Sequence, residues 1–417
     1  MDKNKIIENM KKTILEICEN IGPRPPCSIQ ETKCAEYIKD NLKNYSDEVN
    51  IEEFSCHPDA YKIIMRLPMI SIVIFTIIHW AYLFNASLLF TIIMLIIVSI
   101  ISLIIYYSLT LNLEIIDPIF REKKSTNVFA KILPKNGNDK HNSDIKEHNI
   151  ILIGGHHDSN FEFKLIRISP KLFSFVITSS IISGYLFLVI YIINLFLIYN
   201  TNLNFIFIIL NYIFLIGFSI LMPLYLYSAI IILSNDAVLG ANDNLTSIAI
   251  IIEIAKYFFI QKSLKNTELW LVSHGCEEIG VRGSKRFSKL HKNELKNALI
   301  INIDMIGDKN SNLKIDIKEE VSVIKLYKDL GFAISQLASK MNIDHTIGNI
   351  DAYTDSMAYS QNGLKACSLI GLPKKGLPLY YHTKEDTPDK LDFNKLYLVF
   401  ELLIEFIKKY DKREIEI

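Results

Sequence analysis

The first sixty residues show two kinds of hydrophobic pattern, one helical and one strand-like. Apolar side chains recur at helical spacing over residues 4–20, which predicts an amphipathic helix with one buried face. The segment IGPRPPCS ends that helix at its prolines. Ser28 followed by Glu31 is a capping-box pattern, which predicts a second helix extending to about Tyr45. Residues 49–54 then alternate as expected for a strand.

Two long blocks without Asp, Glu, Lys or Arg interrupt this mixed pattern. Residues 67–84 and 88–113 are two such runs separated by a very short turn, and each is as long as the roughly 18 apolar residues expected of a membrane span. Residues 172–233 form the second block, which a polar break at 200–204 divides into two spans, the later one containing Pro223 and an expected kink. Two uncharged runs in succession disfavour buried core helices. The sequence therefore predicts two transmembrane helical hairpins.

Lys and Arg residues lie at the ends where both predicted hairpins join the rest of the chain, whereas the two hairpin turns carry no Lys or Arg. The flanking residues are Lys62, Arg66, Arg121, Lys123, Lys124, Lys164, Arg167 and Lys171. Because positive residues concentrate on the cytoplasmic side of a bilayer, we expect a multi-pass protein of the cell membrane with its soluble portion in the cytoplasm.

The rest of the chain alternates between strand-like and helix-like segments. Strands are expected near 126–133, 149–153, 268–273, 298–303, 313–317 and 366–372, and a polar loop at 134–148. Two helices are expected to end near residues 259 and 290. Two more are expected near 322–341 and 355–360, and a last one is expected to begin at about residue 393. This order predicts an α/β fold, with a mixed, mostly parallel sheet sandwiched by helices.

Composition narrows the class of protein. The 417 residues include 45 basic and 45 acidic side chains, so there is no basic field for nucleic acid. The N-terminus is charged throughout and does not resemble a signal peptide. The six cysteines form no CxxC pair, which argues against a zinc knuckle and favours reduced thiols in a reducing compartment.

Five short segments place polar residues directly after an apolar strand or at a helix start. Each residue alone has an ordinary explanation; Asp243, for example, is also a suitable helix N-cap. The adjacent Glu277 and Glu278 are costly at the end of a buried strand unless a cation neutralises them. Two histidines and several carboxylates at strand ends suit two divalent metal ions. The set is His156, Asp158, Asp243, Glu277, Glu278, Asp304 and His382.

These segments, GGHHDS, GANDN, CEEIGVRGS, NIDMIG and YHTKEDTPDKLD, resemble in sequence and order those of the co-catalytic zinc exopeptidases. That family includes secreted bacterial leucyl aminopeptidases, plasma glutamate carboxypeptidase and the glutaminyl cyclases. The segment IGPRPPCS is also similar to the family's N-terminal signature. The resemblance implies a zinc exopeptidase fold, a peptide substrate and two zinc ions, although the ligand types also suit manganese or cobalt.

The resemblance also implies a role for each matched residue. Asp243 would bridge two zinc ions. Glu278 and His382 would complete the protein ligands of one ion, and His156 and Asp304 those of the other.

The resemblance also implies roles for three residues in the matched segments that are not metal ligands. Asp158 would hold the tautomer of the His156 imidazole. Glu277 would act as general base and then deliver the proton to the leaving amine. Tyr381 is a candidate for stabilising the tetrahedral intermediate.

Two residues depart from the family pattern. Cys276 stands where the family often has a small residue, and we expect it only to pack. His157 replaces a commonly aromatic residue, and we expect it to be exposed.

The resulting hypothesis is a membrane-anchored zinc metallopeptidase, most readily an aminopeptidase. The alternatives are a glutaminyl-cyclase-like acyltransferase and a non-catalytic receptor or scaffold on the same fold. The second hairpin lies between Asp158 and Asp243 in the chain, which suggests an active-site mouth near the bilayer. The predicted domains are a peptidase domain assembled from 1–62, 114–170 and 235–417, and hairpins at 63–113 and 171–234. Side-chain preference and oligomeric state do not follow from the sequence.

Overall fold

The structure is a computed structural model that describes residues 2–135, 149–198, 203–320 and 324–417. The chain divides into two compact units. The sheet unit comprises Met1–Pro58, Glu122–Glu162 and Asp236–Ile417, and the helical unit comprises Asp59–Arg121 and Phe163–Asn235. Residues 136–148 of the predicted polar loop and 200–202 of the predicted break lie outside the described residues.

The sheet unit contains one mixed nine-stranded sheet with the order β1-β2-β4-β3-β5-β9-β6-β7, and β8 pairs with β6. The central strands β4, β3, β5 and β9 are parallel, so their carboxyl ends meet at one edge. The strands are β1 (Glu48–Cys56), β2 (Lys123–Ile132), β3 (Asn149–His156), β4 (Thr267–His274), β5 (Leu299–Asp304), β6 (Asn312–Glu319), β7 (Ile324–Lys325), β8 (His345–Ile350) and β9 (Lys365–Leu372). This architecture confirms the predicted α/β class.

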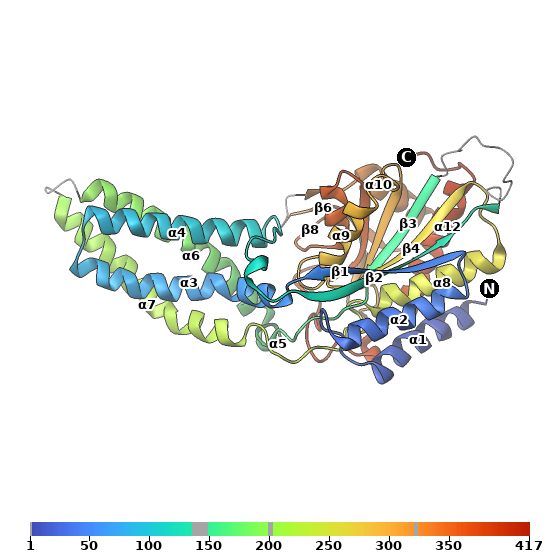
Figure 1. The fold of residues 1–417 in the computed structure, drawn as a ribbon, viewed down its shortest axis with the longest axis horizontal. Coiled ribbons are helices and arrows are strands. Elements are labelled where there is room, and N and C mark those ends of the chain that lie inside the picture. Colours follow the sequence, from blue (N-terminus) through green and yellow to red (C-terminus); the bar gives the residue numbers. More distant parts are fainter. Residues whose placement is uncertain (1, 136–148, 199–202, 321–323) are drawn as a thin grey trace. The chain divides into compact units, whose positions relative to one another are not determined.

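Helices cover both faces of this sheet. Along β3, Ile151 and Ile153 join the apolar core on one face and Leu152 joins the core on the other, as the alternation of a strand requires. Figure 1 shows α1, α2 and α8 side by side along the first face. The helices of this unit are α1 (Lys3–Asn20), α2 (Ile29–Lys43), α8 (Leu245–Gln261), α9 (Arg282–Leu290), α10 (Lys328–Lys340), α11 (Asp355–Gln361) and α12 (Phe393–Asp411).

One predicted boundary differs from the structure, and one strand was not predicted. The helix expected from residue 322 begins at Lys328, because Ile324 and Lys325 pair instead with the end of β6 as the short strand β7. Strand β8 was not predicted, since its sequence HTIGNI lies at the edge of the sheet, contains Gly and Asn, and lacks a clear apolar alternation.

The predicted capping box at the start of α2 forms only in part. The Ser28 hydroxyl accepts a hydrogen bond from the Glu31 backbone N–H at 3.0 Å, as expected for an N-cap. The Glu31 carboxylate does not return to Ser28. It accepts hydrogen bonds from the backbone N–H groups of Cys27 at 2.7 Å and Cys276 at 2.8 Å, and Glu31 is buried. The first turn of α2 is thereby tied to the loop that carries Glu277.

The helical unit contains four helices that are long and apolar enough to cross a membrane. They are α3 (Pro58–Phe84), α4 (Leu88–Leu109), α6 (Pro170–Leu197) and α7 (Asn204–Ile231), and the short α5 (Lys164–Ile168) precedes α6. Pro68 lies inside α3, and Pro223 lies inside α7. Only 17% to 44% of the residues in their most apolar windows are buried, so most of these side chains face outward.

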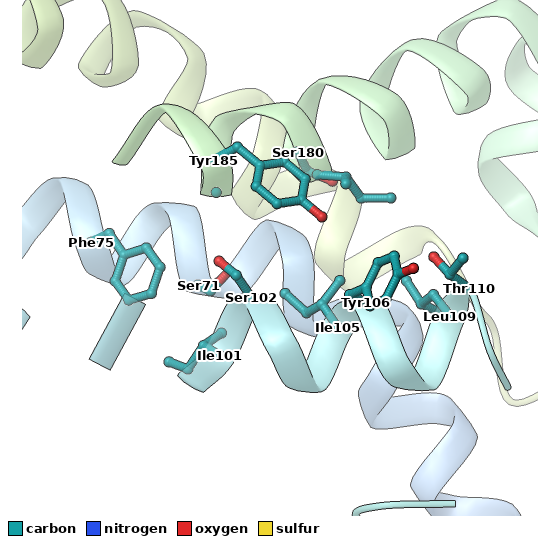
Figure 2. Close-up of a pocket in the computed structure, with 12 residues that line it drawn as sticks. Ser71, Phe75, Ile101, Ser102, Ile105, Tyr106, Leu109, Thr110, Ser180 and Tyr185 are labelled. Carbon is teal, nitrogen blue, oxygen red and sulfur yellow. The ribbon is translucent and has the colours of Figure 1, made fainter. Parts of the chain in front are cut away.

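Polar side chains inside the helical unit pair with one another. The Asn194 and Asn211 amides exchange two hydrogen bonds of 2.9 and 2.8 Å between α6 and α7. Figure 2 shows a small pocket in which Ser180 and Tyr185 of α6 lie near Ser102 and Tyr106 of α4. Hydrogen bonding between polar side chains, as between Asn194 and Asn211, is expected where the surroundings offer polar groups no other partner.

Candidate metal centre

The predicted ligands gather at the carboxyl edge of the central parallel strands. His156 is the last residue of β3, and Asp304 is the last residue of β5. Glu278 follows the end of β4, Asp243 precedes α8, and His382 lies in the loop after β9. All five side chains are buried. The sheet topology thus brings together residues that are far apart in the chain.

His156, Asp243 and Asp304 form the first group of possible ligands. The Nε2 atom of His156 lies 3.2 Å from Oδ1 of Asp243 and 3.8 Å from Oδ1 of Asp304. One nitrogen and two carboxylates, all with ligand atoms within 4.8 Å of one another, form a compact donor set.

Asp243, Glu278 and His382 form the second group. The Nε2 atom of His382 lies 3.1 Å from Oδ2 of Asp243 and 2.9 Å from Oε2 of Glu278. Asp243 is common to both groups, and its two oxygens face different histidines. A carboxylate in that position is suited to bridge two cations.

The donor set fits divalent metal ions on physical grounds. Oε1 of Glu278 and Oδ1 of Asp304 are buried and have no hydrogen-bond partner among the described residues. Burial raises the pKa of Glu278 to about 7, with the Asp243 charge adding to the effect. Burial alone would lower the pKa of His382, but Glu278 and Asp243 raise it to about 10. The carboxylates therefore require compensating positive charge, which bound zinc would provide.

Asp158 supports the site from behind. Its Oδ1 lies 3.3 Å from Nδ1 of His156, on the side of the ring opposite the possible metal-binding nitrogen. Its two oxygens also accept hydrogen bonds from the backbone N–H groups of Glu277 at 3.0 Å and Glu278 at 3.1 Å. One carboxylate thus orients both an imidazole and the loop carrying the paired glutamates.

Two further polar side chains hold the ligands, and the sequence did not single them out. The Asn160 amide donates a hydrogen bond to Oε2 of Glu278 at 2.8 Å. The Asp386 carboxylate accepts from the backbone N–H groups of Asn242 at 2.8 Å and Asp243 at 3.1 Å. Asn160 and Asp386 lie in or beside the motifs, but no spacing signal distinguishes them from solvent-exposed residues.

Arg24 is a third supporting residue, and it comes from the IGPRPPCS segment. It is fully buried, and its guanidinium donates to the backbone carbonyls of His157 at 2.7 Å, Leu239 at 2.8 Å and Gly240 at 3.2 Å. These carbonyls flank the segments that carry His156 and Asp243. Arg24 therefore connects the N-terminal signature to both halves of the site.

Glu277 belongs to neither ligand group among the described residues. One of its carboxylate oxygens lies 3.7 Å from Nε2 of His156, and its side chain is 11% exposed, the most of the group. Burial raises the pKa of Glu277, and the nearby Asp355 adds to the rise. Asp355, itself buried, was not assigned a role from the sequence. Glu277 is thus placed to exchange a proton beside the ligands.

Two other expectations have different outcomes. The Tyr381 ring stacks on His382 with ring centroids 3.6 Å apart, so it lies at the site. The prediction that His157 is exposed is wrong. His157 is buried, its Nδ1 lies 2.8 Å from the Ser273 hydroxyl, and burial lowers its pKa to about 3. Its backbone carbonyl accepts a hydrogen bond from the buried Arg24 guanidinium at 2.7 Å, which links this residue to the IGPRPPCS segment.

Comparison with known proteins agrees with this geometry. Residues 227–407 match the model of Peptidase family M28, a range that includes Asp243, Glu277, Glu278, Asp304 and His382. Aminopeptidase YwaD of Bacillus subtilis is 25% identical over 183 residues, which are 42% of this chain and 38% of that protein. The match therefore spans well under half of the curated relative.

Solved structures show the same fold. A zinc aminopeptidase from Bacillus subtilis superposes with a TM-score of 0.54 at 14% identity, covering 97% of this chain and 96% of the other. A glutaminyl cyclase from Bacteroides thetaiotaomicron gives a TM-score of 0.54 at 15% identity, covering 98% and 97%. The family match and the aminopeptidase relative support a metallo-exopeptidase hydrolase.

Proposed function

We propose that this protein is a membrane-anchored zinc exopeptidase, and that it acts as an aminopeptidase with two zinc ions. The observation that carries the proposal is the pair of ligand groups that share Asp243. His156 and Asp304 would complete the protein ligands of one ion, and Glu278 and His382 those of the other. Bound zinc acts as a Lewis acid that polarises a carbonyl and makes water more acidic.

Glu277 is proposed to move the proton. Its carboxylate lies 3.7 Å from His156 without belonging to either ligand group, and its side chain is more exposed than those of the candidate ligands. In this role it accepts a proton from the attacking water and then donates that proton to the leaving amine. Asp158 accepts a hydrogen bond from the Glu277 backbone N–H and contacts the His156 ring. It would thereby keep the Glu277 carboxylate oriented for proton transfer.

A shallow cavity beside Asp243 is the proposed site for the substrate side chain. Its apolar and aromatic lining residues are Met305, Pro378, Tyr380, Tyr381 and Leu391, and its polar ones include Asp308, Asp386 and Lys390. Its aromatic residues offer a surface for an apolar side chain, and its charged residues offer contacts for polar groups of a substrate. Tyr381 is also proposed to stabilise the tetrahedral intermediate, because its ring stacks on the His382 imidazole.

The experiment for the catalytic proposal combines metal analysis with a substrate panel. The purified full-length chain is expected to contain about two zinc ions and to hydrolyse peptides with a free N-terminus, but not N-blocked peptides. Release of amino acids from the opposite end would instead indicate a carboxypeptidase.

A glutaminyl cyclase is the second candidate, because structures of that class share the fold. It would contain one zinc ion and would cyclise peptides that begin with glutamine. A protein with neither activity and no bound zinc would be a receptor or scaffold.

The membrane proposal rests on the outward-facing apolar side chains of the four long helices. Exposed apolar surface on this scale is expected of a membrane protein and not of a soluble one. The protein should stay with membranes during alkaline extraction, and recovery in the soluble fraction would contradict the anchor. Protease added outside intact cells should leave the sheet unit uncut if it is cytoplasmic.

The substrate is proposed to be reached near the bilayer, since the second hairpin lies between Asp158 and Asp243 in the sequence. Peptides bound to vesicles should then be cleaved faster than the same peptides in solution. Equal rates for the two forms would contradict this part of the proposal.

A further inference from the structure

Three cysteines from distant parts of the sheet unit meet beside the loop that carries the paired glutamates. Cys27 precedes α2, Cys56 is the last residue of β1, and Cys276 directly precedes Glu277. The Sγ atom of Cys27 lies 3.0 Å from that of Cys56 and 3.5 Å from that of Cys276. The Sγ atoms of Cys56 and Cys276 are also 3.5 Å apart. The three sulfurs therefore form a compact triangle.

The backbone holds these sulfurs in place at some cost. Cys27 and Cys276 adopt positive φ angles of 60° and 53°, which residues with a side chain rarely adopt. The buried Glu31 carboxylate accepts a hydrogen bond from the backbone N–H of each, at 2.7 and 2.8 Å. Cys56 is fixed separately, because it pairs with Lys123 across the β1–β2 ladder. All three positions are thus set before any ligand binds.

We propose that Cys27, Cys56 and Cys276 form a thiolate site for a soft metal ion, either zinc or copper(I), distinct from the histidine–carboxylate centre. Thiolates are the ligands that these ions prefer, and the triangle offers three of them at once. Cys56 and Cys276 are buried, whereas Cys27 is half-buried, so one edge of the triangle is partly exposed to solvent.

The surroundings of Cys56 favour its thiolate form, which is the form that binds metal ions. Hydrogen bonds from Cys27 and Cys276 lower the pKa of the Cys56 thiol to about 4, and Arg282 and Arg286 contribute through their positive charge. A metal ion would displace the thiol protons when it binds.

Binding at this site would also act on its neighbour. Cys276 is adjacent to Glu277, and its backbone N–H is already bound by Glu31. An ion held by Cys27, Cys56 and Cys276 would join the N-terminal segment, the end of β1 and the glutamate loop. A bound ion is therefore expected to hold the loop that carries Glu277 in one position. Side chains that hydrogen-bond to metal ligands orient those ligands in a similar way.

Cadmium titration of the reduced full-length protein tests the proposal. One equivalent of Cd²⁺ should produce a thiolate-to-metal charge-transfer band in the ultraviolet, a signal that the histidine–carboxylate centre cannot give. Cys27→Ser and Cys56→Ser should each weaken that binding at least tenfold. Cys34→Ser and Cys367→Ser remove buried cysteines outside the triangle and should leave it unchanged. Separate titrations with Zn²⁺ and Cu⁺ then identify the preferred ion.

A second measurement needs no variant. X-ray absorption at the zinc edge of zinc-loaded wild-type protein should show sulfur ligands at about 2.3 Å. Three results would overturn the proposal. They are zinc and copper(I) spectra that both lack sulfur ligands, a cadmium affinity of Cys27→Ser equal to that of the wild type, and a Cys27–Cys56 disulfide in protein whose thiols were blocked at cell lysis.

Discussion

The Glu31 carboxylate accepts a hydrogen bond from the Cys276 backbone N–H at 2.8 Å, across 245 positions of sequence. Glu31 lies in the first turn of α2, and Cys276 precedes the paired glutamates. This contact attaches the glutamate loop to the N-terminal helix layer. Four consequences of such supporting contacts and of the proposed chemistry, and one of a buried carboxyl group elsewhere, are open to measurement.

Replacing Glu31 should destabilise the fold. Glu31→Ala leaves two buried N–H groups, those of Cys27 and Cys276, without their acceptor, and each costs about 1–3 kcal/mol. Thermal unfolding should occur at a lower temperature, and zinc should be lost more readily. Glu36→Ala, at an exposed position of the same helix, is the control and should change neither. Equal behaviour of the two variants would show that the contact contributes nothing.

Replacing Arg24 should weaken both halves of the metal centre. Arg24→Ala leaves the carbonyls of His157, Leu239 and Gly240 without a charged donor, and hydrogen bonds of this kind contribute about 1.5–3 kcal/mol each. Zinc affinity, measured by competition with a chelator, should fall together with stability. Arg413→Ala removes an exposed arginine and should leave both quantities as in the wild type. Unchanged zinc affinity in Arg24→Ala would contradict the supporting role.

The Asp158 carboxylate should be required in its charged form. Asp158→Asn preserves size but removes one acceptor from the Glu277 and Glu278 backbone and the negative charge beside His156. Loss of such a support typically costs about 10–100-fold in metal affinity or activity. Chelator competition and peptide hydrolysis measure the two separately, with Asp389→Asn as an exposed control. Wild-type values for both would exclude Asp158 as a positioning residue.

Asp316 should make stability depend on pH. Burial raises its pKa to about 7, so between about pH 4 and pH 7 the folded chain holds a proton that the unfolded chain has lost. The stabilisation from this proton is therefore greatest at low pH and is lost as pH rises towards 7. Asp316→Asn removes the titrating group. The melting temperature of the variant minus that of the wild type should therefore increase as the pH is raised from 5 to 8. Asp344→Asn, at an exposed position, should show a constant difference, and a constant difference for Asp316→Asn would refute the assignment.

The sequence singled out the candidate ligands that the fold brings together, but not the side chains that contact them. His156, Asp243 and Asp304 were recognisable because each stands where an apolar strand ends or a helix begins, and the parallel strands then bring those ends together. The resemblance to a known family supplied the pairing of ligands. The same short-range logic missed β8, whose edge position leaves its apolar pattern weak.

Contacts between distant segments were not predictable in this way. The partner of Glu31 was expected to be Ser28, three residues away, and is in part Cys276. The spacing of Cys27, Cys56 and Cys276 showed no motif, since their meeting depends on the β1–β2 ladder and the course of the glutamate loop. His157 was expected at the surface because the Arg24 segment that contacts it is more than a hundred residues earlier in the chain.

The central claim is that Glu277 carries the proton in hydrolysis while other residues hold the metal. Comparison of Glu277→Gln with wild type in zinc content and in the rate of hydrolysis of a free-N-terminal peptide tests it most directly. The account predicts that the variant keeps the wild-type zinc content and loses about 10²–10⁴-fold in kcat. A variant that retains its zinc and full activity would contradict it.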